Sequence, residues 1–385
     1  MSVITEKDLI QALKDAREPN YANPKLRSPI GKYNDFLYEI RNNLLRNKLK
    51  NLSLLDALET LHQQQMDAGF IQYDFSEAKS FQCRNQEGDA FFLGQYNPRR
   101  AERSKGAGRE NPPPGIQTKD TPNTNCFLCP DNIRWQHRGI QLYYQFLIDV
   151  RKYNALCNPF PFMPFHITIA SHLHEPQSWH EFSHFVSKEE KIKILVNDLY
   201  YLSSKIKGFV GFYNGVGSGA SIEKHFHYHF FKVPSGHPPK FPLQMAAERA
   251  KGARGGCNKS KKYIKIKSPT YPLTAFKLYG NPDEVKSHTI ELIRKWNELS
   301  KESASANIIA VWEDDHICFY FVPRNRFFSR SPGLSGTVGG LEALGELIFC
   351  SKSEDQAILK QEVNYDYIWC ILQAVDAPKA HKLDL

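Results

Sequence analysis

The stretch Lys224-His225-Phe226-His227-Tyr228-His229-Phe230-Phe231 is the most informative part of this chain. Its three histidines alternate with aromatic residues. In an extended strand the three imidazoles would therefore share one face and the aromatic rings the other. A single histidine on an apolar strand is usually a satisfied core or surface residue. Three in strict alternation predict a strand with one buried apolar face and one face used for chemistry.

A glycine- and hydroxyl-rich segment precedes this strand, with the sequence Asn214-Gly215-Val216-Gly217-Ser218-Gly219-Ala220-Ser221. Glycine lets the backbone approach a ligand closely, and successive backbone amides can bind phosphate oxygens. Imidazole is a nucleophile that is largely neutral near pH 7. A nucleophilic imidazole beside a phosphate-binding loop predicts phosphoryl or nucleotidyl transfer.

The overall composition is that of an ordinary globular protein, with 385 residues, 41% of them hydrophobic and 24% charged. No apolar run approaches the roughly 20 residues that span a bilayer, and residues 1–8 lack the features of a signal peptide. We therefore expect a cytoplasmic protein with no membrane segment. The formal net charge of +9 is compatible with binding either nucleic acid or small polyanions such as nucleotides.

Basic residues concentrate near residues 99–109 and again across residues 249–267. The end of the second stretch, 259–267, alternates like an edge strand with outward lysines. Such lysines protect a sheet edge from aggregation, and we favour this interpretation over a nucleic-acid site.

The eight cysteines are widely spaced except for Cys126 and Cys129. This distribution argues against a secreted disulfide scaffold and for reduced thiols. The two-residue spacing lets two thiolates bind one tetrahedral zinc from a tight turn, although two unligated thiols remain an alternative. A redox role is disfavoured, because no βαβ pattern surrounds the pair. Zinc would need two further ligands, and the candidates are His137, His166, His172, His174, His180 and His225.

Hydrophobic periodicity divides the chain into three parts, at 1–68, 69–240 and 241–385. The first part is predicted to be helical, at residues 7–17, 33–49 and 52–66. Short alternating pieces such as 70–73 and 90–93 predict strands from residue 69 onward. Residues 98–125 are polar, basic and rich in proline and glycine, and they predict a long surface loop.

The second and third parts predict an α+β fold. Expected strands lie at 141–148, 153–156, 166–170, 209–213 and 225–232, with a helix at 188–206. The third part repeats the order strand, helix, strand, strand at 275–279, 282–301, 307–312 and 316–322. This repeated order hints at an internal duplication whose second half lacks the histidine triad.

Together these residues resemble the histidine-triad superfamily. The closer resemblance is to the branch that holds galactose-1-phosphate uridylyltransferase, diadenosine tetraphosphate phosphorylase and the GDP-hexose phosphorylases, including uncharacterised bacterial relatives. The resemblance implies an antiparallel sheet with flanking helices, built as two histidine-triad-like halves. It spans about residues 90–232 and rests on the blocks 95–100, 126–132, 158–169, 174–177 and 213–221 in addition to the triad.

The resemblance also implies roles for individual residues. His227, the middle histidine, would attack the α-phosphorus and form a covalent nucleotidyl intermediate. His229 would donate a hydrogen bond to the same phosphate. Histidine at this third position is typical of the hydrolase branch, whereas glutamine is common in the transferases. The expected substrate-binding residues are Asn214, Ser218, Gly219, Ser221, Asn158, Arg99 and Lys105.

For the metal, the resemblance implies one structural zinc on Cys126, Cys129, His174 and His225, with His172 competing with His174. The leading function is a nucleotidyltransferase or phosphorylase acting on a nucleoside diphosphate sugar or a dinucleoside polyphosphate. Inorganic phosphate or a sugar phosphate would be the acceptor, and the resemblance also allows a homodimer. The alternatives are a nucleotide hydrolase that uses the same histidine and, less favoured, a nucleic-acid-binding protein.

Overall fold

The computed structural model describes residues 35–67, 70–71, 75, 77–101, 126, 128–133, 141–180, 186–252, 262–327 and 330–385, with side chains of the first helix described from residue 42. The helix predicted at 7–17 lies outside these residues. The chain forms two compact units that are discontinuous in sequence. Unit 1 comprises Met1–Ser76, Arg99–Glu175 and His225–Phe230, and unit 2 comprises Glu77–Pro98, Pro176–Lys224 and Phe231–Leu385. The domain boundaries expected from the sequence stay a prediction.

Unit 1 contains an antiparallel set of four strands, in the order β3-β4-β5-β7. The strands are β3 (Tyr143–Ile148), β4 (Arg151–Cys157), β5 (Ile167–Ser171) and β7 (His227–Lys232). Two helices, α3 (Asp35–Leu49) and α4 (Leu54–Asp67), contact β3, and α4 also contacts β4. A short helix, α6 (Pro130–Ile133), follows the cysteine pair.

The core of unit 1 follows from the alternation of its strands. Ala155, Ile169 and Tyr228 are directly opposed across β4, β5 and β7, and all three are buried. Helix α4 contributes Leu58 and Leu61, which are completely buried. Each such leucine stabilises the fold by about 1.5–3 kcal/mol relative to an exposed one. This aromatic and aliphatic layer leaves the opposite face of β7 to its histidines.

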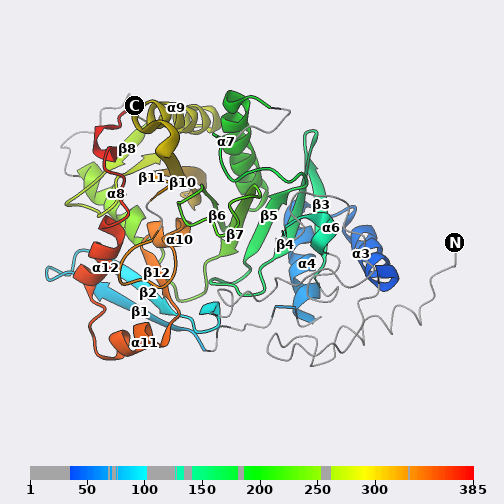
Figure 1. Cartoon of the computed structure of the whole chain (residues 1–385), viewed down its shortest axis with the longest axis horizontal. Helices are drawn as coiled ribbons and strands as arrows, with labels where there is room; N and C mark the ends of the chain where they lie inside the picture. Colours follow the sequence, from blue (N-terminus) through cyan, green and yellow to red (C-terminus); the bar gives the residue numbers. More distant parts are fainter. Residues whose placement is uncertain are drawn as a thin grey trace. The chain divides into compact units, whose positions relative to one another are not determined.

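Unit 2 contains a second antiparallel set, in the order β6-β10-β11-β9-β8. Its strands are β6 (Phe209–Asn214), β8 (Tyr263–Ile266), β9 (Ala275–Leu278), β10 (Ala304–Glu313) and β11 (His316–Asn325). Helices α7 (Lys188–Lys205) and α9 (Pro282–Ser300) pack against each other and against β10 and β11 (Figure 1). Asn281 begins α9 with a capping box to Glu284, which satisfies otherwise unpaired amides of the first turn.

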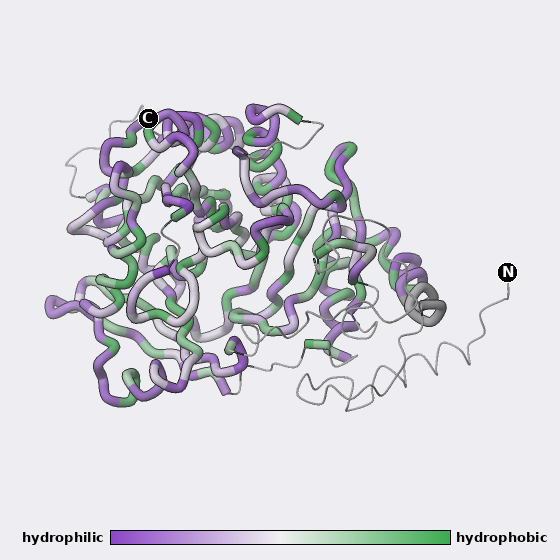
Figure 2. Tube along the Cα trace, viewed as in Figure 1, coloured by the Kyte–Doolittle hydropathy of each residue, from purple (hydrophilic) through white to green (hydrophobic). Residues whose placement is uncertain are grey.

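A smaller sheet in unit 2 has the order β1-β2-β12. Strands β1 (Lys79–Arg84) and β2 (Phe91–Tyr96) form a hairpin, and β12 (Glu346–Phe349) pairs with β2 in parallel. The hairpin turn at residues 85–89 is strongly hydrophilic (Figure 2). The remaining helices of unit 2 are α8 (Pro242–Gly252), α10 (Gly340–Ala343), α11 (Lys352–Leu359) and α12 (Tyr365–Gln373).

The predicted α+β class, with antiparallel sheets and flanking helices, is confirmed. The strand predicted at 70–73 is wrong where it is described, because Phe70 and Ile71 lie outside any strand and their amides bond to the Gln65 carbonyl at the end of α4. The basic segment does form an edge strand, β8, and Lys265 on it donates to the carbonyl of His381. Among the described residues, no helix is long and apolar enough to cross a membrane.

Candidate functional site

The histidine strand β7 pairs with β5 so that His227 opposes Ala170 and His229 opposes Thr168. Directly opposed residues of antiparallel strands share a face. Residues two apart in a strand also share a face, so His227 and His229 lie together, with their ring centroids 4.8 Å apart in an edge-to-face arrangement. His225 precedes the strand rather than joining it. Only two of the three alternating histidines thus lie within the regular strand.

The buried His227 ring is held by the backbone of the residue two positions before it. Its Nδ1 lies 2.7 Å from the carbonyl oxygen of His225. Because a carbonyl oxygen can only accept, Nδ1 must carry the proton. In the neutral ring this places the lone pair on Nε2. The geometry thus gives His227 the tautomer that a nucleophile attacking through Nε2 requires.

His229 lies against a second histidine that the sequence offered only as a metal ligand. Nδ1 of His229 is 3.0 Å from Nε2 of His166 and 3.4 Å from the hydroxyl oxygen of Thr168. His166 itself packs against Phe162, with 4.0 Å between the ring centroids. The alternation in the triad shows nothing of this contact, because His166 lies 63 residues upstream of His229.

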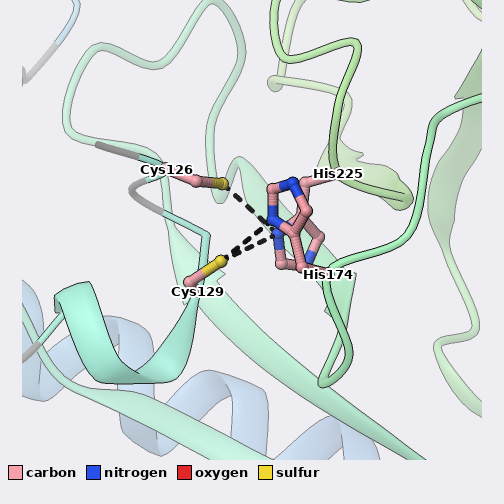
Figure 3. Close-up of side chains that lie close together, drawn as sticks. All are labelled: Cys126, Cys129, His174 and His225. Atoms are coloured by element: carbon pink, nitrogen blue, oxygen red, sulfur yellow. Dashed lines mark hydrogen bonds between the residues drawn. The ribbon is translucent and has the colours of Figure 1, made fainter. Parts of the chain in front are cut away.

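Four of the predicted metal ligands come together in unit 1 (Figure 3). The ligand atoms of Cys126, Cys129, His174 and His225 all lie within 4.8 Å of one another. Nδ1 of His225 is 3.3 Å from the sulfur of Cys126, and Nδ1 of His174 is 3.1 Å from that of Cys129. Tetrahedral zinc with usual bond lengths would hold sulfur and nitrogen roughly 3.6 Å apart. The donor set and its spacing therefore fit zinc.

The surroundings of the two cysteines favour thiolates. The pKa of the Cys126 thiol is lowered, chiefly by a hydrogen bond from Cys129 and also by His174 and His225, against the opposing effect of burial. Thiolate is the form that binds zinc. His225 turns its other nitrogen, Nε2, to the carbonyl oxygen of Ser171 at 2.8 Å. Such a bond orients a metal-ligating imidazole and selects its tautomer.

The competitor His172 lies in a different cluster. Its Nδ1 is 3.0 Å from Nε2 of Gln145, which also donates to Asn154. A side-chain amide nitrogen can only donate, so Nδ1 of His172 is occupied as an acceptor. His174, which follows the end of β5, instead reaches the cysteines. Among the other candidates, His180 bonds to the carbonyl of Ala304 in unit 2, and His137 lies outside the described residues.

For the remaining unit 1 residues predicted to bind substrate, the structure shows no arrangement specific to a substrate site among the described residues. Asn158 accepts a hydrogen bond from the amide of Phe160 and so shapes the turn after β4. Arg99 is exposed, and Lys105 lies outside the described residues. The neighbouring Arg100 donates to the carbonyl of Phe160 at 2.8 Å and its guanidinium lies 5.0 Å from the ring of Phe162. Arg100 is thus a cation beside Phe162, the ring that His166 packs against, and the sequence did not single it out.

The glycine-rich loop belongs to unit 2, and Ser218 is its anchor. The Ser305 hydroxyl donates to the carbonyl of Val216, so the 2.6 Å contact between the two serine oxygens uses the proton of Ser218. The Ser218 amide donates to the carbonyl of Gly215. Ser218 is completely buried, whereas Ser221 is exposed. In this arrangement Ser218 supports the loop, and Ser221 keeps the accessible hydroxyl.

Asn214 is held from the neighbouring strand. Its side-chain oxygen accepts from Nδ2 of Asn307 at 2.8 Å, and the same nitrogen donates to the carbonyl of Ser218 at 2.7 Å. Asn307 in turn accepts from Arg324. Sequence reasoning missed both residues, since they lie about 90 to 110 positions downstream of Asn214.

Comparisons with known proteins give one family model and several similar structures. A family model described as a domain of unknown function (DUF4922) matches residues 60–232. No curated protein matches the sequence. Among solved structures, yeast Ap4A phosphorylase Apa2 in complex with Ap4A is similar, with a TM-score of 0.54 at 14% identity over 85% of this chain and 99% of that chain.

Two further structures extend the comparison. Apa2 in complex with AMP gives a TM-score of 0.52 at 14% identity, over 83% of this chain and 96% of that chain. A GALT-like protein from Arabidopsis thaliana gives 0.34 at 13% identity, over 65% of this chain and 92% of that chain, a score too low to carry an argument. The likeness to Apa2 shows that the two chains share a fold, in agreement with the predicted α+β class.

Proposed function

We propose that this protein is a nucleotidyltransferase of the phosphorylase type that works through a covalent nucleotidyl-His227 intermediate. The observation that carries the proposal is the hydrogen bond from Nδ1 of His227 to the carbonyl of His225, which leaves the lone pair on Nε2. The shared fold with Apa2, which has been solved with Ap4A and with AMP, supports a nucleotide substrate.

In the first step, Nε2 of His227 attacks the α-phosphorus of the substrate. A P–N bond forms as the P–O bond to the leaving phosphate group breaks, and the leaving group departs with the bonding electrons. In the second step, an oxygen of orthophosphate attacks the same phosphorus and the P–N bond breaks. Neutral imidazole is regenerated, and the product is a nucleoside diphosphate.

Other residues would stabilise the charge on the phosphate as it develops. His229 is oriented by His166 and Thr168, and we assign it a hydrogen bond to a phosphate oxygen. From the loop, Gly219 and Ser221 would bind phosphate oxygens, with Asn214 and the anchor Ser218 holding the loop in shape. Asn158 would contact the nucleoside, and Arg99 and Lys105 the outer phosphate or the acceptor.

The zinc would be structural. Cys126, Cys129, His174 and His225 form a closed four-ligand set, and a closed set leaves no open position for substrate. When bound, zinc would fix the turn at the cysteines against His225. The carbonyl of that same residue orients His227.

The alternative is a hydrolase in which water, rather than phosphate, attacks the intermediate. The observation that favours it is His229 at the third triad position, where the transferases commonly carry glutamine. The acceptor therefore separates the two functions, while the first step is common to both.

The test uses Ap4A as the probe, because Apa2 has been solved with it. Intact protein is mixed with Ap4A and its mass is followed, and products are measured with and without orthophosphate. We expect an added AMP mass on wild-type protein and ADP release that depends on phosphate. Release of AMP without phosphate would identify a hydrolase. If neither Ap4A nor a panel of nucleoside diphosphate sugars adds nucleotide mass, the proposed function is wrong.

A further inference from the structure

A fully buried arginine lies beneath the glycine-rich loop of unit 2. Arg324, on β11, has no solvent exposure, and within the described residues its Nε and Nη2 atoms have no hydrogen-bond partner. Burying a charge with unsatisfied donors is costly. Retention of such a group in a core calls for a role other than simple packing.

The contacts of Arg324 show what that role is. Nη1 donates to the side-chain oxygen of Asn307 at 2.7 Å and to the carbonyl of Val338 at 2.9 Å. Because guanidinium only donates, it fixes the Asn307 oxygen toward itself and the amide nitrogen away. Both protons of that nitrogen are then used, on Asn214 and on the carbonyl of Ser218.

A second contact joins the same parts of the chain. Gly219 has φ +93°, and a Cβ there would overlap the backbone of Gly339. A Cβ on Gly339 would in turn lie 2.9 Å from Nδ2 of Asn214. The loop therefore rests on the segment at 338–339, and Arg324 bonds to that segment through Val338 as well as to Asn307.

We propose that Arg324 is a positioning residue: by orienting Asn307 it fixes Asn214 and Ser218, and so holds the glycine-rich loop in the conformation that receives phosphate. The receipt of phosphate rests on the function proposed above, whereas the fixing of the loop does not. The role is directional, because only an amide with its oxygen toward Arg324 can donate to both loop acceptors.

The decisive variant is Asn307→Asp, which preserves shape and keeps an acceptor for Arg324. It removes both donors, so the Ser218 carbonyl faces an oxygen and the Asn214 amide must turn over. Arg324→Met removes the orienting charge, and Arg324→Lys restores a charge and a donor. The matched control is Lys277→Met, which breaks a largely buried ion pair with Glu313 elsewhere in unit 2.

Hydrogen exchange of the amides at 215–221 is measured on the full chain without ligand. We expect Asn307→Asp and Arg324→Met to exchange at least about tenfold faster there than wild type, with partial recovery in Arg324→Lys. Lys277→Met should leave the exchange rates of these amides at their wild-type values, even if it lowers Tm as much as the other variants do. Wild-type exchange in Asn307→Asp, or equal acceleration in Lys277→Met, would overturn the proposal. If Arg324→Met does not fold, Asn307→Asp decides, since it keeps the arginine.

A second readout links the loop to chemistry. Single-turnover formation of the nucleotide adduct from Ap4A should be at least about tenfold slower in Asn307→Asp, well below its Tm, and near wild type in Lys277→Met. Fast loop exchange combined with wild-type labelling would overturn the link to phosphate. If wild-type protein forms no adduct at all, the proposed function fails, while the exchange result still decides the role of Arg324.

Discussion

The histidine strand of unit 1 and the glycine-rich loop of unit 2 are positioned in different ways. His227 is fixed by the carbonyl of His225, two residues before it, and by the regular pairing of β7 with β5. The loop is fixed by Ser305, Asn307 and Arg324, which lie about 90 to 110 residues downstream. The alternation of side chains along a strand sets the direction in which a side chain points. An irregular loop has no such pattern, and buried polar partners must fix its conformation.

The largest expected effect lies on the strand. His227→Ala should reduce turnover of Ap4A by at least about 10³-fold, because it removes the proposed nucleophile. Steady-state kinetics and intact mass would measure the loss of rate and of the adduct, and circular dichroism would show that the fold is kept. His316→Ala, at an exposed histidine of unit 2, is the control and should react like wild type. A His227→Ala variant with the wild-type rate would rule out the intermediate.

The metal cluster gives the next largest effect. Elemental analysis should find one zinc per chain, and chelation should lower the free energy of unfolding by about 4 kcal/mol if zinc is about 1,000-fold above its Kd. His174→Ala should lose zinc and His172→Ala should keep it, because His174 contacts Cys129 whereas Nδ1 of His172 accepts from Gln145. Cys370→Ser, at an exposed thiol, is the control for Cys126→Ser. Full zinc content in His174→Ala would contradict the ligand set.

Gly217 in the glycine-rich loop can be compared with Gly88, a second glycine in the left-handed backbone region. Gly217 has φ +69°, and a Cβ there would overlap the backbone of Arg326, whereas Gly88 has φ +75° and no atom within 4 Å of a Cβ. Gly88→Ala should cost about 1–2 kcal/mol for the left-handed backbone alone. Gly217→Ala should cost at least about 1 kcal/mol more, because backbone cannot move as a flexible side chain can. Urea denaturation measures both, and equal costs would mean that the loop is loosely packed.

The smallest effect is a pH dependence at a buried pair of unit 2. His237 and Glu346 form a buried pair, with Nε2 2.9 Å from the carboxylate and Nδ1 donating to the carbonyl of Pro238. Burial opposes the charged ring, but Glu346 and Pro238 outweigh it and raise the pKa of His237. A raised folded pKa gives stability that is complete below the unfolded pKa of about 6.5 and is lost as pH rises through the folded value.

Wild-type protein should therefore lose stability as pH rises above about 6.5, and Glu346→Gln should lose less over the same range. Tm measured at intervals from pH 5.5 to 9 would show the effect. His381→Gln, at an exposed histidine, is the control and should keep the wild-type profile. Identical pH profiles for wild type and Glu346→Gln would show that the pair does not hold a charged imidazole.

Regular elements could be read from the sequence because their periods are local. The expected helices at 188–206 and 282–301 correspond to α7 and α9, and the strand at 209–213 to β6. The parallel strand β12 was missed, since its four residues carry no alternation that distinguishes them from other short apolar runs. The strand expected at 70–73 is wrong where it is described, because the amides of Phe70 and Ile71 instead bond to the Gln65 carbonyl near the end of α4.

The candidate site shows the same contrast between features set by local sequence spacing and features set by distant partners. The CxxC pair and the triad were visible because their spacing in sequence reflects their geometry. His174 and His172 were indistinguishable, since two residues of sequence do not reveal which ring Gln145 would occupy. Ser218, expected to hold phosphate, bonds to Ser305, and sequence gives no means to predict a partner 87 residues away.

The imidazole and the backbone carbonyl of His225 make separate contacts, and together they affect how much conformational entropy the His227 ring loses during the reaction. Its imidazole lies in the metal cluster while its carbonyl holds the His227 ring. The rotation of that ring is therefore restricted during folding, before any nucleotide arrives. Conformational entropy that has already been lost is not lost again in the transition state, so preorganisation of this kind lowers the barrier without a new contact to substrate. Metal removal should accordingly slow the first chemical step even where nucleotide affinity is kept.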